Sequence, residues 1–374
     1  MRAALFGVLL ACTASHPGSA DDFYREDLHI SMAAAGPPGL EALLIRPSGP
    51  QRYPLALISH GTAIDASERR AMSPYRYFSH AIEFARRGFA AVVVMRRGFG
   101  ESSGGYPEGG CCNVASYLRS ARTGARDLRA AIDAMNSRSD VTTEGMIAVG
   151  VSAGGFASIA LTEDPPPGLG AVISFAGGRR RTRPSDDTTR DLSDEAALIG
   201  AFQTIGKTSR IPTLWIYAEN DKYFGPDVAH GLHAAFTAGG GRAEFIDAPA
   251  FGSDGHSLFG GAGGKSIWLP TVDRFLHQHN LGSPELLAPP TTAALSLPPG
   301  LGEKGRAGFA DYLAAGQHKA FVTSPRGAFG YRAGMRSAAE ALSAALTSCA
   351  KHAPDCAPYA IDDQPVAKAS SGSL

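Results

Sequence analysis

Short apolar runs alternate with helix-like segments over most of the chain, from residue 27 to about residue 279. This alternation is typical of a mostly parallel β-sheet that carries helices on both faces. Eight runs have the length and composition of strands, namely 27–32, 40–46, 54–59, 89–95, 146–149, 171–175, 212–218 and 243–248. Helical spacing occurs between them at 75–87, 116–137, 154–161, 227–238 and 269–279. The sequence therefore predicts an α/β fold built on one eight-stranded sheet.

The N-terminus has the features of an export signal. Arg2 supplies a positive charge, an apolar run follows at 4–11, and small residues at 18–20 precede Asp21. The run is too short to span a bilayer, and no other apolar run approaches that length. We therefore expect a signal peptide at 1–20 and a periplasmic or secreted bacterial protein. An alternative is a membrane-tethered lipoprotein, because the residues before Cys12 resemble a lipoprotein box.

The composition indicates a small or neutral substrate. The chain has 35 Lys and Arg against 35 Asp and Glu, so overall charge gives no reason to expect nucleic acid as a partner. No Cys and His residues have zinc-site spacing, and we predict no metal. A glycine-rich stretch at 263–266 lacks the first glycine of a phosphate loop, where the chain has Phe259, and no nucleotide or other cofactor is expected.

The C-terminal part is predicted to form a separate unit. Residues 281–301 are rich in proline and read as a linker. Beyond it, a small α+β module is expected at 302–366, and we call it the C-terminal module. Its expected elements are a helix that begins at Ser337 and short strands at 319–323, 327–332 and 359–362. The last residues, 367–374, have the composition of a disordered tail.

Export changes how the cysteines are interpreted, because an oxidising compartment allows thiols to pair. Cys349 and Cys356 bracket a short polar segment, and a disulfide between them is expected. Cys111 and Cys112 are adjacent, and a ring between neighbours is strained, so a vicinal disulfide and free thiols both remain open.

One serine has the sequence context of a nucleophile. Ser152 lies in a Gly-x-Ser-x-Gly motif between a buried strand and a helix, where a sharp turn requires small neighbours such as Gly150 and Gly154. A second match, centred on Ser102, is followed by a Gly- and Pro-rich stretch that cannot form a helix, and it is interpreted as a loop.

A catalytic serine needs a histidine base and a carboxylate that orients it. Asp221 directly follows the strand at 212–218, and His256 lies in the loop after the strand at 243–248. Loops after parallel strands meet at one edge of a sheet, so these side chains are expected to converge on Ser152. Glu219 and Asp254 compete with Asp221 for the acid role, and the position at the end of the strand favours Asp221.

These motifs resemble the α/β-hydrolase superfamily, in particular its dienelactone-hydrolase-like branch. The resemblance covers residues 27–280 and is carried by His60-Gly61-Thr62, by 97–102, by 150–154, by Glu219-Asn220-Asp221 and by Asp254-Gly255-His256. It implies a catalytic domain at 21–280 with the α/β-hydrolase fold, and an oxyanion hole made by the backbone N–H groups of Thr62 and Ala153. It also implies a brace role for His60 and a possible lid within 176–210.

The resulting functional prediction is an exported serine hydrolase that cleaves carboxylic esters of small molecules through Ser152, His256 and Asp221. Dienelactone hydrolases typically use a cysteine nucleophile, so the serine favours a general esterase. One alternative is a serine peptidase of the prolyl-oligopeptidase-like type. Such enzymes usually carry a propeller domain before the hydrolase domain, and here few residues precede the first strand. The other alternative is a secreted, non-catalytic binding protein.

Overall fold

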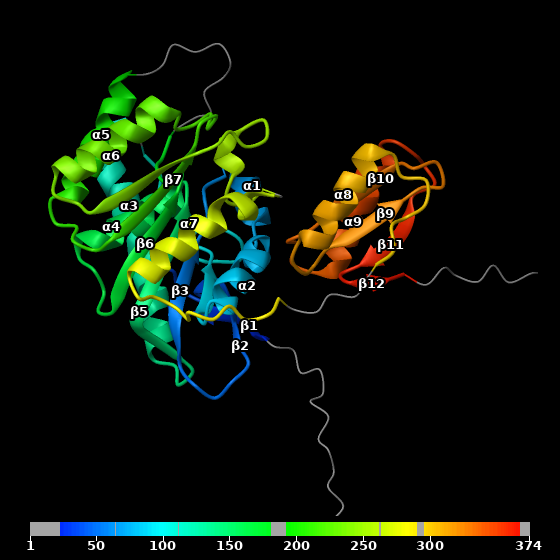
Figure 1. Cartoon of the computed structure of the whole chain (residues 1–374), viewed down its shortest axis with the longest axis horizontal. Coiled ribbons are helices and arrows are strands. Elements are labelled where there is room, and N and C mark those ends of the chain that lie inside the picture. The colour runs from blue at the N-terminus through cyan, green and yellow to red at the C-terminus, as the bar shows by residue number, and fades with distance from the viewer. Residues whose placement is uncertain are drawn as a thin grey trace, which may run out of the picture.

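The computed structural model describes residues 23–63, 65–110, 112–180, 192–261, 263–289 and 295–366. The chain forms two β-sheets, a large one in the N-terminal domain and a small one in the C-terminal module (Figure 1). The predicted signal peptide, Cys12, Cys111 and the predicted tail lie outside the described residues.

The large sheet has eight strands in the order β1-β2-β4-β3-β5-β6-β7-β8. The strands β1 and β2 pair antiparallel, β2 also pairs antiparallel with β4, and the other neighbours are parallel. Their bounds are Phe23–Ile30, Leu40–Pro47, Tyr53–Ser59, Ala90–Val94, Val141–Val151, Leu169–Phe175, Thr213–Ala218 and Ala243–Ala248 for β1 to β8. The predicted eight-stranded, mostly parallel sheet is confirmed.

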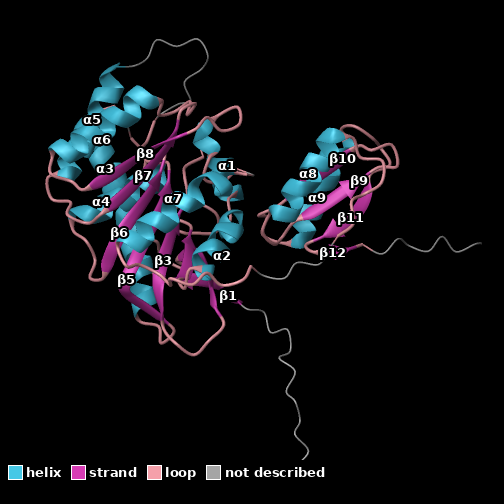
Figure 2. Cartoon of the chain, in the orientation of Figure 1, coloured by secondary structure: helices cyan, strands magenta, loops and turns pink. Residues whose placement is uncertain are grey.

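Helices cover both faces of this sheet (Figure 2). One face is packed by α3 (Val114–Asn136), α4 (Ala153–Ala160), α5 (Leu192–Gly206) and α6 (Pro226–Ala238). The other is packed by α2 (Phe78–Arg86), which follows the short helix η1 (Pro74–Tyr77), and by α7 (Gly264–Gln278). The strands in the middle of the sheet are buried on both sides, which explains their continuous apolar runs.

The segment 176–210 contains a covering helix that the sequence prediction missed. Helix α5 buries Ala201, Phe202 and Ile205 in the core shared with α3 and α6. This part of the segment therefore belongs to the layer over the sheet and not to a lid. The residues 181–191 of the same segment lie outside the described part of the chain.

The C-terminal module is a four-stranded antiparallel sheet with one helix on each face. The strand order is β10-β9-β11-β12, with bounds Phe329–Arg332, Ala320–Thr323, Ala357–Ile361 and Gln364–Pro365. Alternate residues of β9 point to opposite faces: Phe321 packs with α8 (Glu303–Ala314), and Val322 packs with α9 (Ala338–Ala350). Helix α8 and strand β12 were not predicted.

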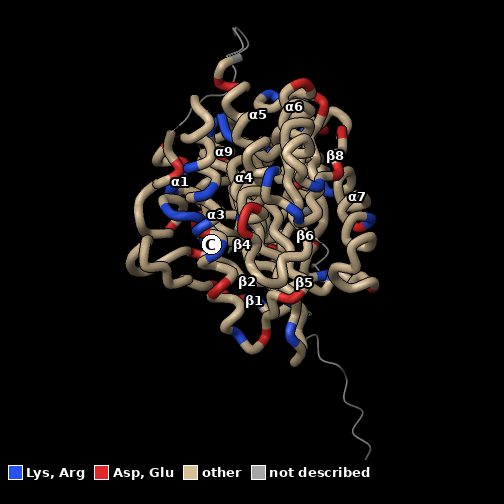
Figure 3. Tube along the Cα trace, turned by 90° about the vertical axis from the view of Figure 1, so that its left-hand side faces the viewer, with Lys and Arg blue, Asp and Glu red and all other residues tan. Residues whose placement is uncertain are grey.

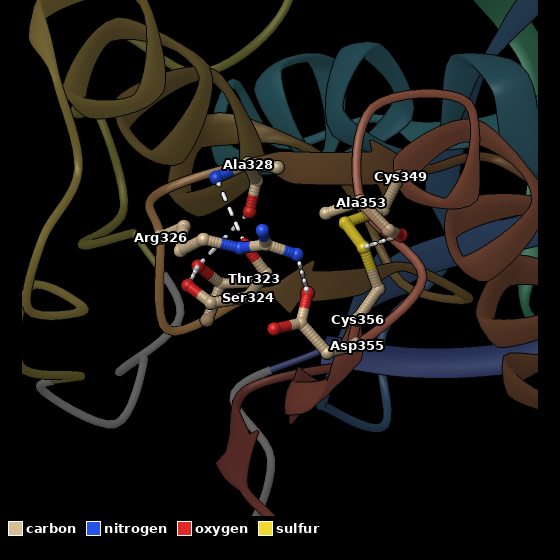
Figure 4. The surroundings of a disulfide bond; sticks show 8 residues. All are labelled: Thr323, Ser324, Arg326, Ala328, Cys349, Ala353, Asp355 and Cys356. Atoms are coloured by element: carbon tan, nitrogen blue, oxygen red, sulfur yellow. Dashed lines mark hydrogen bonds and ion pairs between the residues drawn. A yellow bond between two sulfur atoms is a disulfide. The ribbon is translucent and has the colours of Figure 1, made fainter.

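Two sulfur atoms link the end of α9 to the start of β11. Cys349 and Cys356 form the predicted disulfide, seven positions apart in the sequence, and the loop between them includes Ala353, whose carbonyl lies beside Cys356 (Figure 4). Cys112 also takes part in a disulfide.

Charged residues of both signs are interspersed along the trace (Figure 3), in agreement with the balanced composition. Within the described ranges, no helix has the length and apolar character needed to cross a bilayer.

The C-terminal module contacts the N-terminal domain through a half-buried arginine. Arg336 donates to both carboxylate oxygens of Glu41 on β2, at 2.5 and 3.4 Å, and to the carbonyl of Met72 at 2.6 Å. Met72 is the residue that ends α1 (Ala66–Ala71). A second contact joins the Ser73 hydroxyl to the Gly334 carbonyl.

We expect Arg336→Ala to destabilise the protein by about 2 kcal/mol, because it leaves the Glu41 carboxylate largely buried without its cation. Urea unfolding followed by circular dichroism measures the change. The matched control is Arg326→Ala, since Arg326 is exposed and its pair with Asp355 spans 3.5 Å, so less than about 0.5 kcal/mol is expected there. Equal effects of both substitutions would contradict the proposed importance of the Glu41 contact.

A buried histidine makes stability depend on pH. His80 on α2 packs against Phe259 and Trp268, and burial lowers its pKa to about 3. Between pH 6.5 and 3 the unfolded chain binds a proton that the folded chain does not, so stability falls with falling pH through this range. The loss attributable to this group approaches about 4 kcal/mol at pH 3.

Replacing His80 by glutamine is expected to flatten the fall in unfolding free energy between pH 6.5 and 4, measured by urea titration at several pH values. His29→Gln is the control, because the His29 side chain is exposed on the edge strand β1. An unchanged slope in His80→Gln would show that His80 is not the group responsible.

Candidate functional site

Ser152 occupies a sharp turn between β5 and α4. Its backbone has φ 55° and ψ −124°, a conformation that an L-residue rarely adopts. The Ser152 N–H donates to the carbonyl of Phe175 on β6 at 2.9 Å, and the Ser152 carbonyl accepts from the N–H groups of Phe156 and Gly178 at 3.0 and 3.1 Å. The turn is therefore held from both sides, which stabilises the strained backbone.

The two glycines of the motif are required by close backbone contacts. A Cβ at Gly150 would lie 2.3 Å from the carbonyl oxygen of Gly154. A Cβ at Gly154 would lie 2.3 Å from the carbonyl oxygens of Ser59 and His60. Both distances are far shorter than a van der Waals contact, so the strand and the helix can approach only without these side chains.

Asp221 and His256 form a hydrogen-bonded pair. The Nδ1 atom of His256 lies 3.0 and 3.2 Å from the two carboxylate oxygens of Asp221. The carboxylate also accepts the N–H groups of Tyr223 and Phe224 at 2.7 and 2.9 Å, and its side chain is fully buried. The His256 ring is 18% exposed and packs against the Tyr223 ring, with 4.4 Å between the ring centroids.

The competing carboxylates occupy different positions. Asp254 caps the short helix η3 (Gly255–Ser257), where its side chain accepts the N–H groups of His256 and Lys222 at 3.0 and 3.1 Å. Glu219 is exposed, and its N–H donates to the Ala248 carbonyl at 3.0 Å. Within the described part of the chain, the hydrogen bonds to the imidazole ring come from Asp221.

The three predicted side chains follow three strands of the parallel part of the sheet. Ser152 follows β5, Asp221 follows β7, and His256 lies in the loop after β8. The structure thus places them at the same edge, where the strands end. No hydrogen bond joins Ser152 to His256 among the described contacts, and such bonds are often long before substrate binds. The catalytic roles of the three residues stay predictions.

The predicted oxyanion donors lie beside the serine. A Cβ added at Gly61 would be 3.3 Å from the Ser152 Cβ and 3.9 Å from its hydroxyl oxygen, so the loop that carries Thr62 passes close to Ser152. Ala153 is the first residue of α4, where a backbone N–H has no partner within the helix. These positions are compatible with the predicted oxyanion hole. The hole itself stays a prediction.

His60 has the contacts of a structural brace. It is fully buried, its Nδ1 donates to the Gly61 carbonyl at 2.5 Å, and its Nε2 accepts the Arg96 N–H at 3.0 Å. Burial and the nearby Arg96 hold its pKa well below the ordinary value, so the ring is neutral. Both nitrogens are engaged, which agrees with the predicted bracing role and leaves none for proton transfer.

Sequence reasoning missed a buried ion pair below this loop. Arg96 is fully buried, pairs with Glu108 at 2.5 Å, and donates to the Ser59 hydroxyl and the His60 carbonyl at 2.8 and 2.6 Å. Glu108 also lies 3.5 Å from Arg179, which hydrogen-bonds to the Tyr106 hydroxyl. The sequence offers one signal for this ion pair. Arg96 and Arg97 directly follow a buried strand, and charged side chains are rarely buried there without a partner.

The second Gly-x-Ser-x-Gly match has a structural role. Ser102 lies in a loop, as predicted, where its hydroxyl donates to the Met95 carbonyl at 2.6 Å and accepts the Glu41 N–H at 2.9 Å. Both hydrogen-bonding directions of this buried hydroxyl are therefore used.

Two arginines follow β6 at the start of the segment that leads to α5. Arg179 and Arg180 are largely buried and paired, with Arg180 at 2.5 Å from Glu195. Within the described ranges, no group of three or more metal-binding side chains occurs.

One family model matches the chain. The model is described as X-Pro dipeptidyl-peptidase (S15 family), and it matches residues 38–190. The match includes Ser152 and ends before Asp221 and His256. It covers less than half of the chain. No curated protein matches the sequence.

Solved structures share the fold at low sequence identity. An acylaminoacyl peptidase from Pyrococcus horikoshii matches with a TM-score of 0.50 and 14% identity, over 71% of this chain and 42% of that one. The chain thus spans about two fifths of the length of that peptidase. A putative dienelactone hydrolase from Klebsiella pneumoniae matches with a TM-score of 0.46 and 13% identity, over 69% of this chain and 98% of that one.

An esterase from Thermogutta terrifontis matches with a TM-score of 0.46 and 17% identity, over 70% of this chain and 96% of that one. Three observations indicate the same fold: the match to the acylaminoacyl peptidase, the strand order of the large sheet, and the sharp turn at Ser152 between β5 and α4. The chain is therefore a protein of the α/β-hydrolase fold.

Proposed function

We propose that this protein is an exported serine hydrolase that cleaves carboxylic esters of small molecules. The observation that carries the proposal is the strained Ser152 turn at the sheet edge where the buried Asp221 carboxylate holds the imidazole of His256. The strained turn and the buried carboxylate both cost folding free energy. Together they can activate a serine hydroxyl as a nucleophile, which gives a chemical reason for keeping them.

In the first half of the reaction, the Ser152 oxygen attacks the ester carbonyl carbon while the Nε2 atom of His256 takes the hydroxyl proton. The negative charge that develops on the carbonyl oxygen is stabilised by the N–H groups of Thr62 and Ala153, which need no reorganisation during the step. The bond to the alcohol oxygen then breaks, and the imidazolium gives its proton to the leaving alcohol. The product is an ester between Ser152 and the acyl group.

In the second half, His256 takes a proton from water as the water oxygen attacks the acyl carbon. The bond to Ser152 breaks, the serine oxygen recovers the proton, and the carboxylic acid leaves. Through both halves Asp221 keeps the Nδ1 proton in place and stabilises the imidazolium, while remaining ionised itself. No step requires a cofactor.

The direct test is labelling of the intact protein with a fluorophosphonate, which reacts covalently with activated serines. The proposal expects labelling that disappears in Ser152→Ala. A folded protein that stays unlabelled would favour the alternative of a secreted, non-catalytic binding protein.

A peptidase is the second candidate function. It is favoured by the family model at 38–190, whose description names an X-Pro dipeptidyl-peptidase, and by the fold of the acylaminoacyl peptidase. Peptide and ester cleavage use the same catalytic groups and differ in the leaving group, which is an amine for a peptide.

A substrate panel separates the two candidates. Esters of graded acyl length are compared with X-Pro and acyl-amino-acid p-nitroanilides, all with the full chain. We expect kcat/KM to be highest for an ester, and a higher value for a p-nitroanilide would assign the protein as a peptidase.

Export is tested separately from chemistry. Mass spectrometry of the mature protein from a bacterial host should give an N-terminus at Asp21 if a signal peptide at 1–20 is removed. A lipid-modified N-terminus at Cys12 would instead identify a tethered lipoprotein.

A further inference from the structure

A cavity of about 1080 Å³ lies between the two sheet-containing units. The N-terminal domain contributes the segment from Tyr75 to His80 and the loop at 260–265, and the C-terminal module contributes the 327–334 hairpin with parts of α8 and α9. Ser152, Asp221 and His256 are not among its lining residues. The cavity is therefore distinct from the site of the proposed hydrolysis.

The walls of this cavity carry an excess of positive charge. Four cationic side chains line it, and Asp311 is the one lining carboxylate; the cations are Arg76, Lys265, Lys304 and Arg332. They come from both units, since Arg76 and Lys265 belong to the N-terminal domain. Like charges brought together in this way repel one another unless a ligand supplies the opposite charge.

None of the four cations forms an ion pair with a carboxylate in the described part of the chain, whereas most of the other arginines near the domain contact do. Asp311 instead lies 3.4 Å from the Tyr331 hydroxyl. The cationic groups thus have donors available for a ligand.

Lys265 is the most constrained of the four. Its ammonium donates to the Ser79 carbonyl at 3.1 Å, which occupies one of its three donors. Burial lowers the pKa of Lys265, the nearby Glu83 carboxylate opposes this shift, and Arg86 and Arg87 add to it. A largely buried ammonium with one hydrogen-bond partner is costly, and an anion in the cavity would offset that cost.

The remaining lining suits an organic molecule. The rings of Phe329 and Tyr331 supply apolar surface, and Gly330 and Gly334 expose backbone where side chains would otherwise fill the space. Pockets that bury drug-sized ligands have volumes of roughly 300–1,000 Å³ and combine apolar walls with a few polar groups. The volume here lies just above that range.

We propose that the cavity between the two units binds a multiply charged organic anion of the size of a short acidic oligosaccharide, through Lys265, Lys304 and Arg332. The recognised chemistry is two or more carboxylate, sulfate or phosphate groups spaced along one small molecule. Because the cations belong to both units, the ligand bridges the N-terminal domain and the C-terminal module.

The test measures binding to the full chain carrying Ser152→Ala, so that no probe is consumed by hydrolysis. The probes are a trigalacturonate, which carries carboxylates on a sugar frame, and inorganic tripolyphosphate, which carries phosphates without sugar rings. Isothermal titration calorimetry gives Kd for each. We expect saturable one-to-one binding that weakens as salt is raised. The trigalacturonate should bind more tightly than tripolyphosphate because the rings of Phe329 and Tyr331 contact its sugar frame, and the reverse order would contradict the organic nature of the ligand.

The variant that tests the site is Lys304→Ala together with Arg332→Ala, both exposed positions whose loss should not impair folding. We expect Kd to increase about tenfold or more, because losing a hydrogen bond to a charged group weakens binding by such a factor. Lys265→Gln is the second variant, because it removes the charge and keeps a donor for the Ser79 carbonyl.

The matched control is Lys207→Ala together with Arg242→Ala, which removes the same two charges at exposed positions outside the cavity lining. Its Kd should be unchanged. Failure of both probes to bind, or equal weakening in the control and the cavity variant, would overturn the proposal. Neither outcome affects the proposed hydrolysis, which is measured with Ser152 intact.

Discussion

Replacing Ser152 by alanine is expected to lower kcat for a soluble ester by about 10⁶-fold, because the variant has no nucleophile at the turn. The proposed oxyanion donors, the N–H groups of Thr62 and Ala153, remain in this variant, so a rate about 10³-fold above the reaction in water should persist. Stopped-assay measurement of product release from a short-chain p-nitrophenyl ester detects both levels.

Ser102→Ala is the matched control, since it changes the same residue type in the second Gly-x-Ser-x-Gly motif. Its hydroxyl bridges the Met95 carbonyl and the Glu41 N–H, so the substitution should lower stability by about 1–2 kcal/mol and leave kcat within a few-fold. If Ser102→Ala abolished activity in the folded state and Ser152→Ala did not, the nucleophile assignment would be wrong.

Asp221→Asn is expected to lower kcat by about 10⁴-fold, with KM little changed. An amide at this position can donate to Nδ1 of His256 and so favour the wrong tautomer, in which Nε2 carries the proton and cannot accept one from Ser152. The N–H groups of Tyr223 and Phe224 can still donate to the amide oxygen, so the loop should keep its conformation.

Asp254→Asn provides the comparison for the acid, because its carboxylate caps the turn that carries His256 by accepting the His256 N–H. An amide oxygen still accepts the two N–H groups, and kcat should fall by less than about tenfold. A larger loss in Asp254→Asn than in Asp221→Asn would transfer the acid role to Asp254.

The sheet could be predicted because its central strands are buried on both faces. A run such as Ala90–Val94 is apolar at every position, and the helices between such runs keep one face for the core. The same reasoning places Ser152, Asp221 and His256 at one edge without any knowledge of side-chain contacts, since it depends only on strand order and direction.

The helices that were missed are those whose burial comes from tertiary packing. Helix α5 has Asp194 and Glu195 in its first turn, a start signal that the sequence analysis did not use, and it is apolar on more than one side because α3, α6 and the sheet all cover it. Helix α8 has glycines at 305 and 308, which lower its helix propensity, and Gly308 is needed because a Cβ there would lie 2.6 Å from the Phe329 ring.

Contacts between distant segments could not be predicted from sequence. Arg336 and Glu41 are 295 positions apart, and nothing in either neighbourhood identifies the other. The same is true of Arg96 with the His60 loop, where a local pattern shows a charge but not its partner. Such pairs depend on how whole elements pack, which periodicity does not encode.

The bond between Cys349 and Cys356 makes the C-terminal module sensitive to reductants. Closing so short a loop removes entropy from the unfolded chain worth about 2 kcal/mol, a large share of what a domain this small can gain from its core. In a thiol-rich medium the module would lose this support while the larger domain kept its own core. Assembly of the two units would then be complete only in an oxidising medium.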